Sequence, residues 1–192
     1  MKKIVLASNN KHKVKEIKEL LSDYEVLNLD DIDFHDEIIE DGKTFEENAL
    51  IKARVIHNYL KDKNLDYIVM ADDSGLCVDS LGGEPGVFSA RYAGNHDDVA
   101  NRNKLLKEIE GKDRTAHFVC DIALYYPDGT YKIFEGVTDG EISKEEKGSK
   151  EFGYDCVFFS TELSKTFGQA TKEEKNSVSH RGRALKNMLN NM

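Results

Sequence analysis

The feature that most constrains the fold is an apolar run, Tyr67-Ile68-Val69-Met70-Ala71, followed at once by Asp72-Asp73-Ser74-Gly75. A short apolar run that ends in turn residues predicts a strand buried on both faces. Because α/β folds bind ligands beyond the carboxyl ends of their strands, the carboxylate cluster is a first candidate site.

The first part of the chain adds strands and helices around that run. Lys3 to Ala7 predicts a second buried strand, which passes through Ser8-Asn9-Asn10 into a helix with apolar residues at helical spacing. Thr44-Phe45-Glu46-Glu47 predicts a capping box that opens another helix. On that helix, Thr44, Asn48 and Lys52 recur every four residues and therefore form a polar line along one side.

The second part of the chain predicts an antiparallel hairpin and two more helices. Pro127-Asp128-Gly129 separates two strand-like segments and predicts the hairpin turn. The order of elements predicts a mixed α/β protein, and the length of the chain, residues 1–192, fits one large domain or two lobes that share a core. The expected helices run from Asp98 to Ile109 and from Asn176 to Asn190, and the expected strands are Phe118 to Leu124, Tyr131 to Val137 and Val157 to Phe159.

Composition limits the classes of protein. A hydrophobic content of 39% and a charged content of 33% are typical of a soluble globular chain, and no apolar run approaches the roughly 20 residues that span a bilayer. The apolar run after Met1-Lys2-Lys3 is too short for a signal peptide, so we expect a cytoplasmic location and no membrane partner. A net charge of −9 disfavours nucleic-acid binding. Cys77, Cys120 and Cys156 are widely spaced and are predicted to be reduced thiols.

Basic residues near both ends of the chain are candidates for binding an anion. The predicted strand-to-helix turn leaves free backbone N–H groups, which suit a phosphate, although a capped surface helix with solvated lysines explains the same residues. Near the other end, cationic groups suit phosphate or a base, while a lone histidine is more often structural. The two groups are Ser8, Asn9, Asn10, Lys11, His12 and Lys13 at the start, and Lys175, His180 and Arg181 at the end.

Carboxylates between these ends are candidates for holding a metal ion. Successive strand residues point to opposite faces, so Asp72 and Asp73 should not both reach one metal. Mg²⁺ prefers one or two carboxylates together with substrate phosphates, and Glu40 is a candidate second ligand. A solvated turn at the aspartates and an exposed glutamate in an acidic run are the structural alternatives.

One aromatic motif could contact a nucleobase. In Phe152-Gly153-Tyr154-Asp155, an aromatic ring could stack on a base and the aspartate could accept its N–H groups. A tight turn packed by aromatic side chains explains the motif equally well.

Several motifs in one order closely resemble the inosine triphosphatase (dITP/XTP pyrophosphatase) family. The resemblance runs from Lys3 to about Leu189. The motifs are Ser8-x-Asn10-x-x-Lys13-x-x-Glu16, Thr44-Phe45-x-Glu47-Asn48-Ala49-x-x-Lys52-Ala53, Ala71-Asp72-Asp73-Ser74-Gly75-Leu76, Leu81-Gly82-Gly83-x-Pro85-Gly86, Ser89-Ala90-Arg91-Tyr92, Phe152-Gly153-Tyr154-Asp155 and Ser179-His180-Arg181-Gly182.

The resemblance implies a fold, a reaction and partners. The fold would be α/β and ITPase-like, with a long mixed central sheet and flanking helices that form two lobes around a nucleotide cleft. The reaction would hydrolyse purine nucleoside triphosphates with a 6-oxo group (ITP, dITP and XTP) to the monophosphate and pyrophosphate, which cleanses the nucleotide pool. The cofactor would be Mg²⁺, and the protein would be a homodimer.

The same resemblance implies roles for individual residues. Asp73 would be the proton acceptor and a Mg²⁺ ligand, Glu40 the second ligand, and Asp72 a supporting residue. The substrate-binding residues would be Ser8, Asn9, Asn10, Lys11, His12, Lys13, Lys52, Ser74 and Lys175 for phosphate and sugar, and Phe152, Gly153, Tyr154, Asp155, His180 and Arg181 around the base.

Two other functions compete with this hypothesis. A Maf-like pyrophosphatase acting on dTTP or UTP also begins with a strand and a similar turn, but the motifs at residues 152–155 and 179–181 favour the purine family. A nucleotide-binding module without hydrolysis is the second alternative. The presence of Asp73, Glu40 and the lysines together argues against it.

Overall fold

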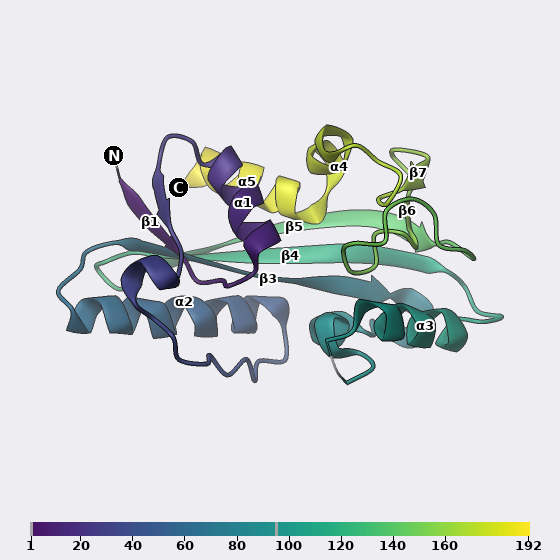
Figure 1. Ribbon diagram of the computed structural model, residues 1–192, viewed down its shortest axis with the longest axis horizontal. Coiled ribbons are helices and arrows are strands. Elements are labelled where there is room, and N and C mark those ends of the chain that lie inside the picture. The colour runs from purple at the N-terminus through teal and green to yellow at the C-terminus, as the bar shows by residue number, and fades with distance from the viewer. Residues whose placement is uncertain (1, 95) are drawn as a thin grey trace. The chain divides into compact units, whose positions relative to one another are not determined.

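The structure is a computed structural model that describes residues 2–94 and 96–192, without the side chains of Lys11, His12 and Glu16. Its seven-stranded sheet has the order β2-β1-β3-β4-β5-β6-β7 (Figure 1). β1 pairs in parallel with β2 and β3, whereas β6 pairs antiparallel with β5 and β7, so the predicted mixed sheet is confirmed. The strands are β1 (Lys3–Leu6), β2 (Glu25–Leu27), β3 (Ile68–Val78), β4 (Thr115–Tyr125), β5 (Tyr131–Ile142), β6 (Phe158–Ser160) and β7 (Lys165–Thr166).

The chain divides into two compact units. Unit 1 comprises Met1–Asp73 and Asp121–Phe134, and unit 2 comprises Ser74–Cys120 and Glu135–Met192. The peptide bond between Asp73 and Ser74 therefore joins the two units within β3. The α-helices are α1 (Lys11–Leu20), α2 (Phe45–Asp62), α3 (Asp98–Glu108), α4 (Lys172–Val178) and α5 (His180–Asn191).

In unit 1, α1 and α2 lie on opposite sides of the strands (Figure 1). Apolar side chains of α2 are buried and pack with strand residues such as Val5 and Val69. Thr44 caps α2, because its side chain accepts a hydrogen bond from the backbone N of Glu47 at 3.1 Å. The carboxylate of Glu47 accepts instead from the backbone N of Lys43 at 2.6 Å, so only half of the predicted capping box forms.

In unit 2, α3 and α4 lie on opposite sides of the strands (Figure 1). α3 begins after Asp97, whose side chain accepts hydrogen bonds from the backbone N–H groups of Val99 and Ala100. Leu105 and Ile109 pack into a core with Phe118 and other buried apolar side chains. The predicted helix from residue 98 to 109 is confirmed to within one residue.

Two predicted boundaries are wrong. β3 does not end at Ala71 but continues to Val78, because its backbone keeps pairing within the sheet and this pairing overrides the turn propensity of residues 72–75. The expected helix over residues 176–190 is two helices, since Ser179 is extended (φ −69°, ψ 153°). Ser179 caps α5 by accepting from the backbone N of Gly182 at 3.1 Å.

Two simpler predictions concern cysteines and membrane spans. All three cysteines are free thiols, as predicted. Within the part of the chain that the structure describes, no helix is both long and apolar enough to cross a membrane.

Candidate active site

The two adjacent aspartates have different partners because they lie inside β3, where successive side chains point to opposite faces. Asp72 is buried, with a side chain 1% exposed, and its Oδ2 accepts from Lys13 Nζ at 2.9 Å. Asp73 instead contacts Asn48 and Lys52 of α2. The predicted separation of the two carboxylates is therefore confirmed, and Asp72 anchors the lysine of the first turn of α1.

Asp73 belongs to a cluster in unit 1 that brings together residues 40, 48, 52 and 73. Lys52 Nζ lies 2.6 Å from Glu40 Oε2 and 3.5 Å from Asp73 Oδ1. Asn48 Nδ2 donates to the other oxygen, Asp73 Oδ2, at 3.1 Å. Because residues 48 and 52 are one helical turn apart, α2 presents a separate donor to each oxygen of the Asp73 carboxylate.

Burial sets the acid–base properties of this cluster. Burial raises the pKa of the Asp73 carboxyl, and the nearby Glu40 raises it further, against the opposing effects of Lys52 and the hydrogen bond from Asn48. Burial alone lowers the pKa of Lys52, but Asp73, Glu40 and Asp72 outweigh it, so the net shift is upward and the ammonium stays charged. A carboxylate with a raised pKa is a stronger proton acceptor than a solvated aspartate.

Two carboxylates of the same cluster could hold a hard divalent cation. Glu40 and Asp73 supply carboxylate oxygens, and the ammonium of Lys52 between them marks a position where positive charge is stabilised. Among the described residues, no group of three or more His, Cys, Asp or Glu side chains could hold a metal. Mg²⁺ is commonly held by one or two carboxylates and completed by substrate phosphates and water, so this sparse donor set suits it.

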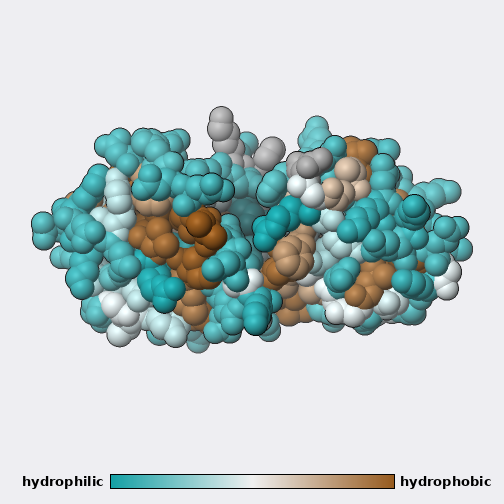
Figure 2. Space-filling view, turned by 90° about the horizontal axis from the view of Figure 1, so that it is seen from below, coloured by the Kyte–Doolittle hydropathy of each residue, from teal (hydrophilic) through white to brown (hydrophobic). Residues whose placement is uncertain are grey.

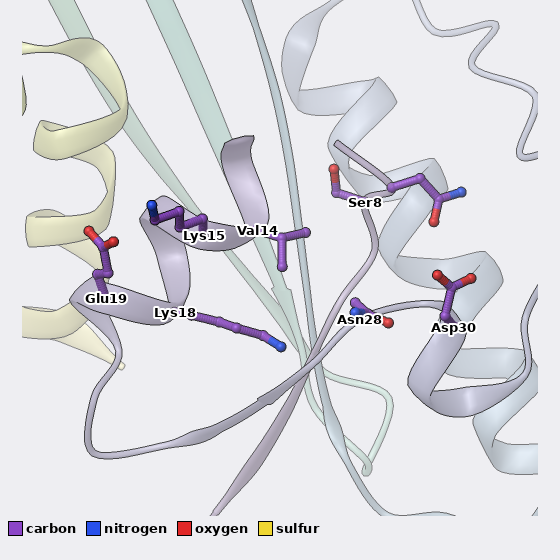
Figure 3. Close-up of a pocket in the computed structure, with 8 residues that line it drawn as sticks. Ser8, Val14, Lys15, Lys18, Glu19, Asn28 and Asp30 are labelled. Carbon is purple, nitrogen blue, oxygen red and sulfur yellow. The ribbon is translucent and has the colours of Figure 1, made fainter. Parts of the chain in front are cut away.

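The turn before α1 lines a pocket of about 650 Å³ in unit 1 (Figure 3). Asn10 Oδ1 accepts from the backbone N of Lys13 at 3.2 Å, which is N-cap geometry. Lys11 and His12 were also predicted to bind substrate, but their side chains lie outside the part of the chain that the structure describes. The lining residues are Ser8, Asn9, Val14, Lys15, Lys18, Glu19, Asn28 and Asp30.

Figure 3 shows Lys18 extending from α1 toward the side of the pocket where Asn28 lies. Sequence reasoning missed Lys15 and Lys18 as pocket residues. Their spacing of three residues places both lysines on one side of α1, and this spacing could have indicated that they line the same pocket.

In unit 2, a second group of predicted residues surrounds Lys175. Its Nζ lies 2.5 Å from Asp155 Oδ2 and 4.9 Å from the centroid of the Phe152 ring. An ammonium over an aromatic face is attracted by the ring quadrupole. One cation, one carboxylate and one aromatic ring are therefore in direct contact at this position.

The two residues between Phe152 and Asp155 hold the turn in place. The backbone N of Gly153 donates to Asp98 Oδ2 at 2.9 Å, and its carbonyl accepts from Arg102 Nη1 at 2.8 Å. Tyr154 is buried, and its hydroxyl donates to the carbonyl of Ser89 at 2.7 Å. The structure thus places the Tyr154 side chain in the core, while the side chains of Phe152 and Asp155 contact Lys175.

The first turn of α5 holds His180 and Arg181, both buried. The imidazole of His180 stacks on Phe118 of β4, with ring centroids 4.6 Å apart and an interplanar angle of 11°. Arg181 Nη2 donates to Ser74 Oγ at 3.1 Å, which brings together two residues predicted to bind substrate. Sequence reasoning missed Phe118, whose alternating position indicated only a buried strand face.

The fold and these side chains define an α/β protein with a lysine–carboxylate cluster in unit 1 and a separate aromatic, cationic group in unit 2.

Comparison with known proteins identifies the family. The Ham1 family model matches residues 4–191. A dITP/XTP pyrophosphatase from Clostridium perfringens is 49% identical, with alignment over 100% of this chain and 98% of the relative. One from Bacillus subtilis is 45% identical, over 98% of this chain and 96% of the relative. The chain belongs to the Ham1 family.

Solved structures agree with this assignment. The Staphylococcus aureus Ham1 protein matches with a TM-score of 0.86 and 43% identity, over 96% of this chain and 95% of that one. A HAM1 protein from Coxiella burnetii matches with a TM-score of 0.87 and 40% identity, over 98% of this chain and 96% of that one. The resemblance inferred from the motifs is confirmed, and the assignment favours it over the Maf-like alternative.

Proposed function

We propose that this protein hydrolyses non-standard purine nucleoside triphosphates (ITP, dITP and XTP) to the nucleoside monophosphate and pyrophosphate, and so cleanses the nucleotide pool. The observation that carries the chemistry is the half-buried carboxylate of Asp73, held by Asn48 and Lys52. Full-length likeness to proteins named dITP/XTP pyrophosphatase supports the substrate class.

In the proposed mechanism, Asp73 accepts the proton of a water that attacks the α-phosphorus. The new bond joins the water oxygen to phosphorus, and the bond from phosphorus to the pyrophosphate oxygen breaks. Lys52 stabilises the negative charge around the reacting phosphate, in a buried site where electrostatic interactions are strong. When bound at Glu40 and Asp73, Mg²⁺ would polarise phosphate oxygens and neutralise charge on the leaving group.

We propose that the unit 2 group binds the base. The ring of Phe152 offers a stacking face, and the carboxylate of Asp155 offers an acceptor for base N–H groups. His180 and Arg181 supply donors suited to a 6-oxo group. Support comes from the contacts that hold these side chains in place, namely the Lys175 pair with Asp155 and the stacked ring behind His180.

The homodimer, the cytoplasmic location and the absence of nucleic-acid partners are further parts of the proposal. A second copy would cover apolar surface on unit 1, where Figure 2 shows hydrophobic side chains gathered on the face that α2 covers. Exposed apolar residues of this unit include Ile39, Val55 and Tyr131. Light scattering coupled to size-exclusion chromatography measures the oligomeric state, and a monomer at micromolar concentration would contradict this part.

A substrate panel tests the proposed reaction. Pyrophosphate release should be fastest with ITP, dITP and XTP, slower with ATP, GTP and dTTP, and lost when EDTA removes Mg²⁺. Preferred turnover of dTTP would instead support a Maf-like enzyme, and nucleotide binding without pyrophosphate would support a binding module.

Replacing Asp73 tests its role as the proton acceptor. Asp73→Asn should lower kcat by at least about 10²-fold, as loss of a positioned base typically does. Asp62→Asn, at an exposed position at the end of α2, is the matched control and should keep wild-type activity. Near-normal turnover of Asp73→Asn would remove Asp73 from the catalytic role.

A further inference from the structure

Asn48 is a buried polar residue at the centre of the Asp73 cluster, and none of the roles above explains it. Its side chain lies on α2 one turn before Lys52, and the residue is only 2% exposed. Burying a carboxamide is unfavourable unless its polar atoms are hydrogen-bonded. The two partners of this side chain therefore indicate what the residue does.

The two ends of the Asn48 carboxamide hold two different segments. Its Oδ1 accepts from the backbone N of Gly42 at 2.9 Å, and its Nδ2 donates to Asp73 Oδ2 at 3.1 Å. The chemistry of the partners fixes this orientation, because a backbone N–H requires an acceptor and a carboxylate requires a donor. A Cβ at Gly42 would lie 2.6 Å from Asn48 Oδ1, so the close approach depends on glycine.

Lys52 repeats this arrangement one turn further along α2. Its ammonium contacts the carboxylate of Glu40 at 2.6 Å and Asp73 Oδ1 at 3.5 Å. Asn48 and Lys52 thus tie residues 40–42 to α2 at two points and bind opposite oxygens of Asp73. Because the Asn48 amide binds Oδ2 of Asp73, Oδ1 of Asp73 is the oxygen that faces the Lys52 ammonium.

We propose that Asn48 is a positioning residue that fixes the rotation of the Asp73 carboxylate and so directs Oδ1 toward the reaction. This inference rests on the proposed function, in which Asp73 is the proton acceptor. A carboxylate free to rotate about its Cβ–Cγ bond would present either oxygen, and small errors in the position of a reacting group are costly. Partners that orient a functional carboxylate typically contribute about 10–100-fold to activity.

Two substitutions separate the two hydrogen bonds of Asn48. Asn48→Asp keeps an acceptor for the N–H of Gly42 but replaces the donor to Asp73 with a like charge. Asn48→Ala removes both contacts. We expect both variants to lose about 10–100-fold in kcat for ITP while they bind a non-hydrolysable ITP analogue with near wild-type Kd. Wild-type kcat in Asn48→Asp would overturn the inference.

A matched control measures how much the loss of any buried asparagine lowers stability and, through it, activity. Asn101 on α3 is 1% exposed and bonds the backbone N of Ala93 and the carbonyl of Ala90. Asn101→Ala should lower the melting temperature as Asn48→Ala does, yet keep kcat. Equal kcat losses in the two alanine variants would show that Asn48 acts only through stability.

A double-mutant cycle with Asp73→Asn tests whether Asn48 acts through Asp73. If it does, Asn48→Ala should cost almost nothing further in the Asp73→Asn background, because the oriented group is already absent. If the kcat losses of Asn48→Ala and Asp73→Asn multiply in the double variant, the inference is overturned. Full activity of Asp73→Asn alone would instead remove Asp73 from its catalytic role in the proposed function, so the two failures are distinguishable.

Discussion

The contact between β5 and the first turn of α5 makes Gly136→Ala a sensitive test of how the base-binding group is positioned. A Cβ at Gly136 would lie 2.1 Å from the carbonyl oxygen of His180 and 2.4 Å from the backbone N of Ala184. Ordinary contact begins near 3.4 Å, so the helix must move by about 1 Å to accept one methyl group. The residues that move are those at the start of α5, including Arg181.

The expected effects follow from that displacement. Overpacking of this kind costs about 1–3 kcal/mol. In a chain of this size each kcal/mol lowers Tm by about 2–4 °C, so the Tm of Gly136→Ala should fall by about 2–12 °C. Because misplacement by about 1 Å can cost up to about 10²-fold, kcat/KM for ITP should fall by at least about tenfold, mainly through KM.

Thermal melting and steady-state pyrophosphate release measure these two effects on the same preparations. Met188→Ala is the control, since Met188 is fully buried further along α5 and its loss leaves a cavity without pushing on the first turn. It should lower Tm comparably while kcat/KM stays near wild-type. If Gly136→Ala keeps the wild-type KM despite a lower Tm, the start of α5 does not position the base.

Two further substitutions test charge placement. Lys52→Met should lower kcat at least about tenfold by removing the cation beside the reacting phosphate. Because it also removes the charge that opposes the upward pKa shift of Asp73, its Tm deficit relative to wild type should shrink as pH falls through the raised pKa of Asp73 toward 3.8, and a pH-independent deficit would contradict this. Glu146→Gln should cost about 2 kcal/mol in urea unfolding by leaving Arg102 without its carboxylate. Since Lys150 and Arg102 lower the pKa of Glu146, the stability they add is present above pH 4.5 and lost below it, so the variant's deficit should shrink in acid.

Local patterns in the sequence were sufficient to predict most helices and the separation of the two aspartates. The starts of α2 and α3 depend on spacing and capping within a few residues, and both are confirmed. The opposite orientation of Asp72 and Asp73 follows from strand alternation alone, and their different partners agree with it.

The features that sequence reasoning missed depend on contacts between distant residues. Asn48 and Asp73 are 25 positions apart, so the polar line on α2 did not indicate which residue Asn48 contacts. Phe118 and His180 meet because β4 and α5 pack together, which the pattern around neither residue encodes. β3 runs through residues 72–75 because neighbouring strands satisfy its backbone, a stabilisation that local turn propensity does not include.

The position of the aspartate pair within a strand, rather than after it, also explains how one residue type performs two tasks. Two carboxylates on one side would repel each other, but β3 sends them to opposite faces, where α1 and α2 each supply a lysine (Figure 1). The side chain of Asp72 is 1% exposed, and its ion pair at 2.9 Å makes it a fixed anchor for Lys13. Asp73 is 16% exposed, lies further from its lysine at 3.5 Å and has a raised pKa, so it remains accessible and can accept a proton. Moving the pair by one position along β3 would exchange the two environments, which is why the register of this strand determines which carboxylate is reactive.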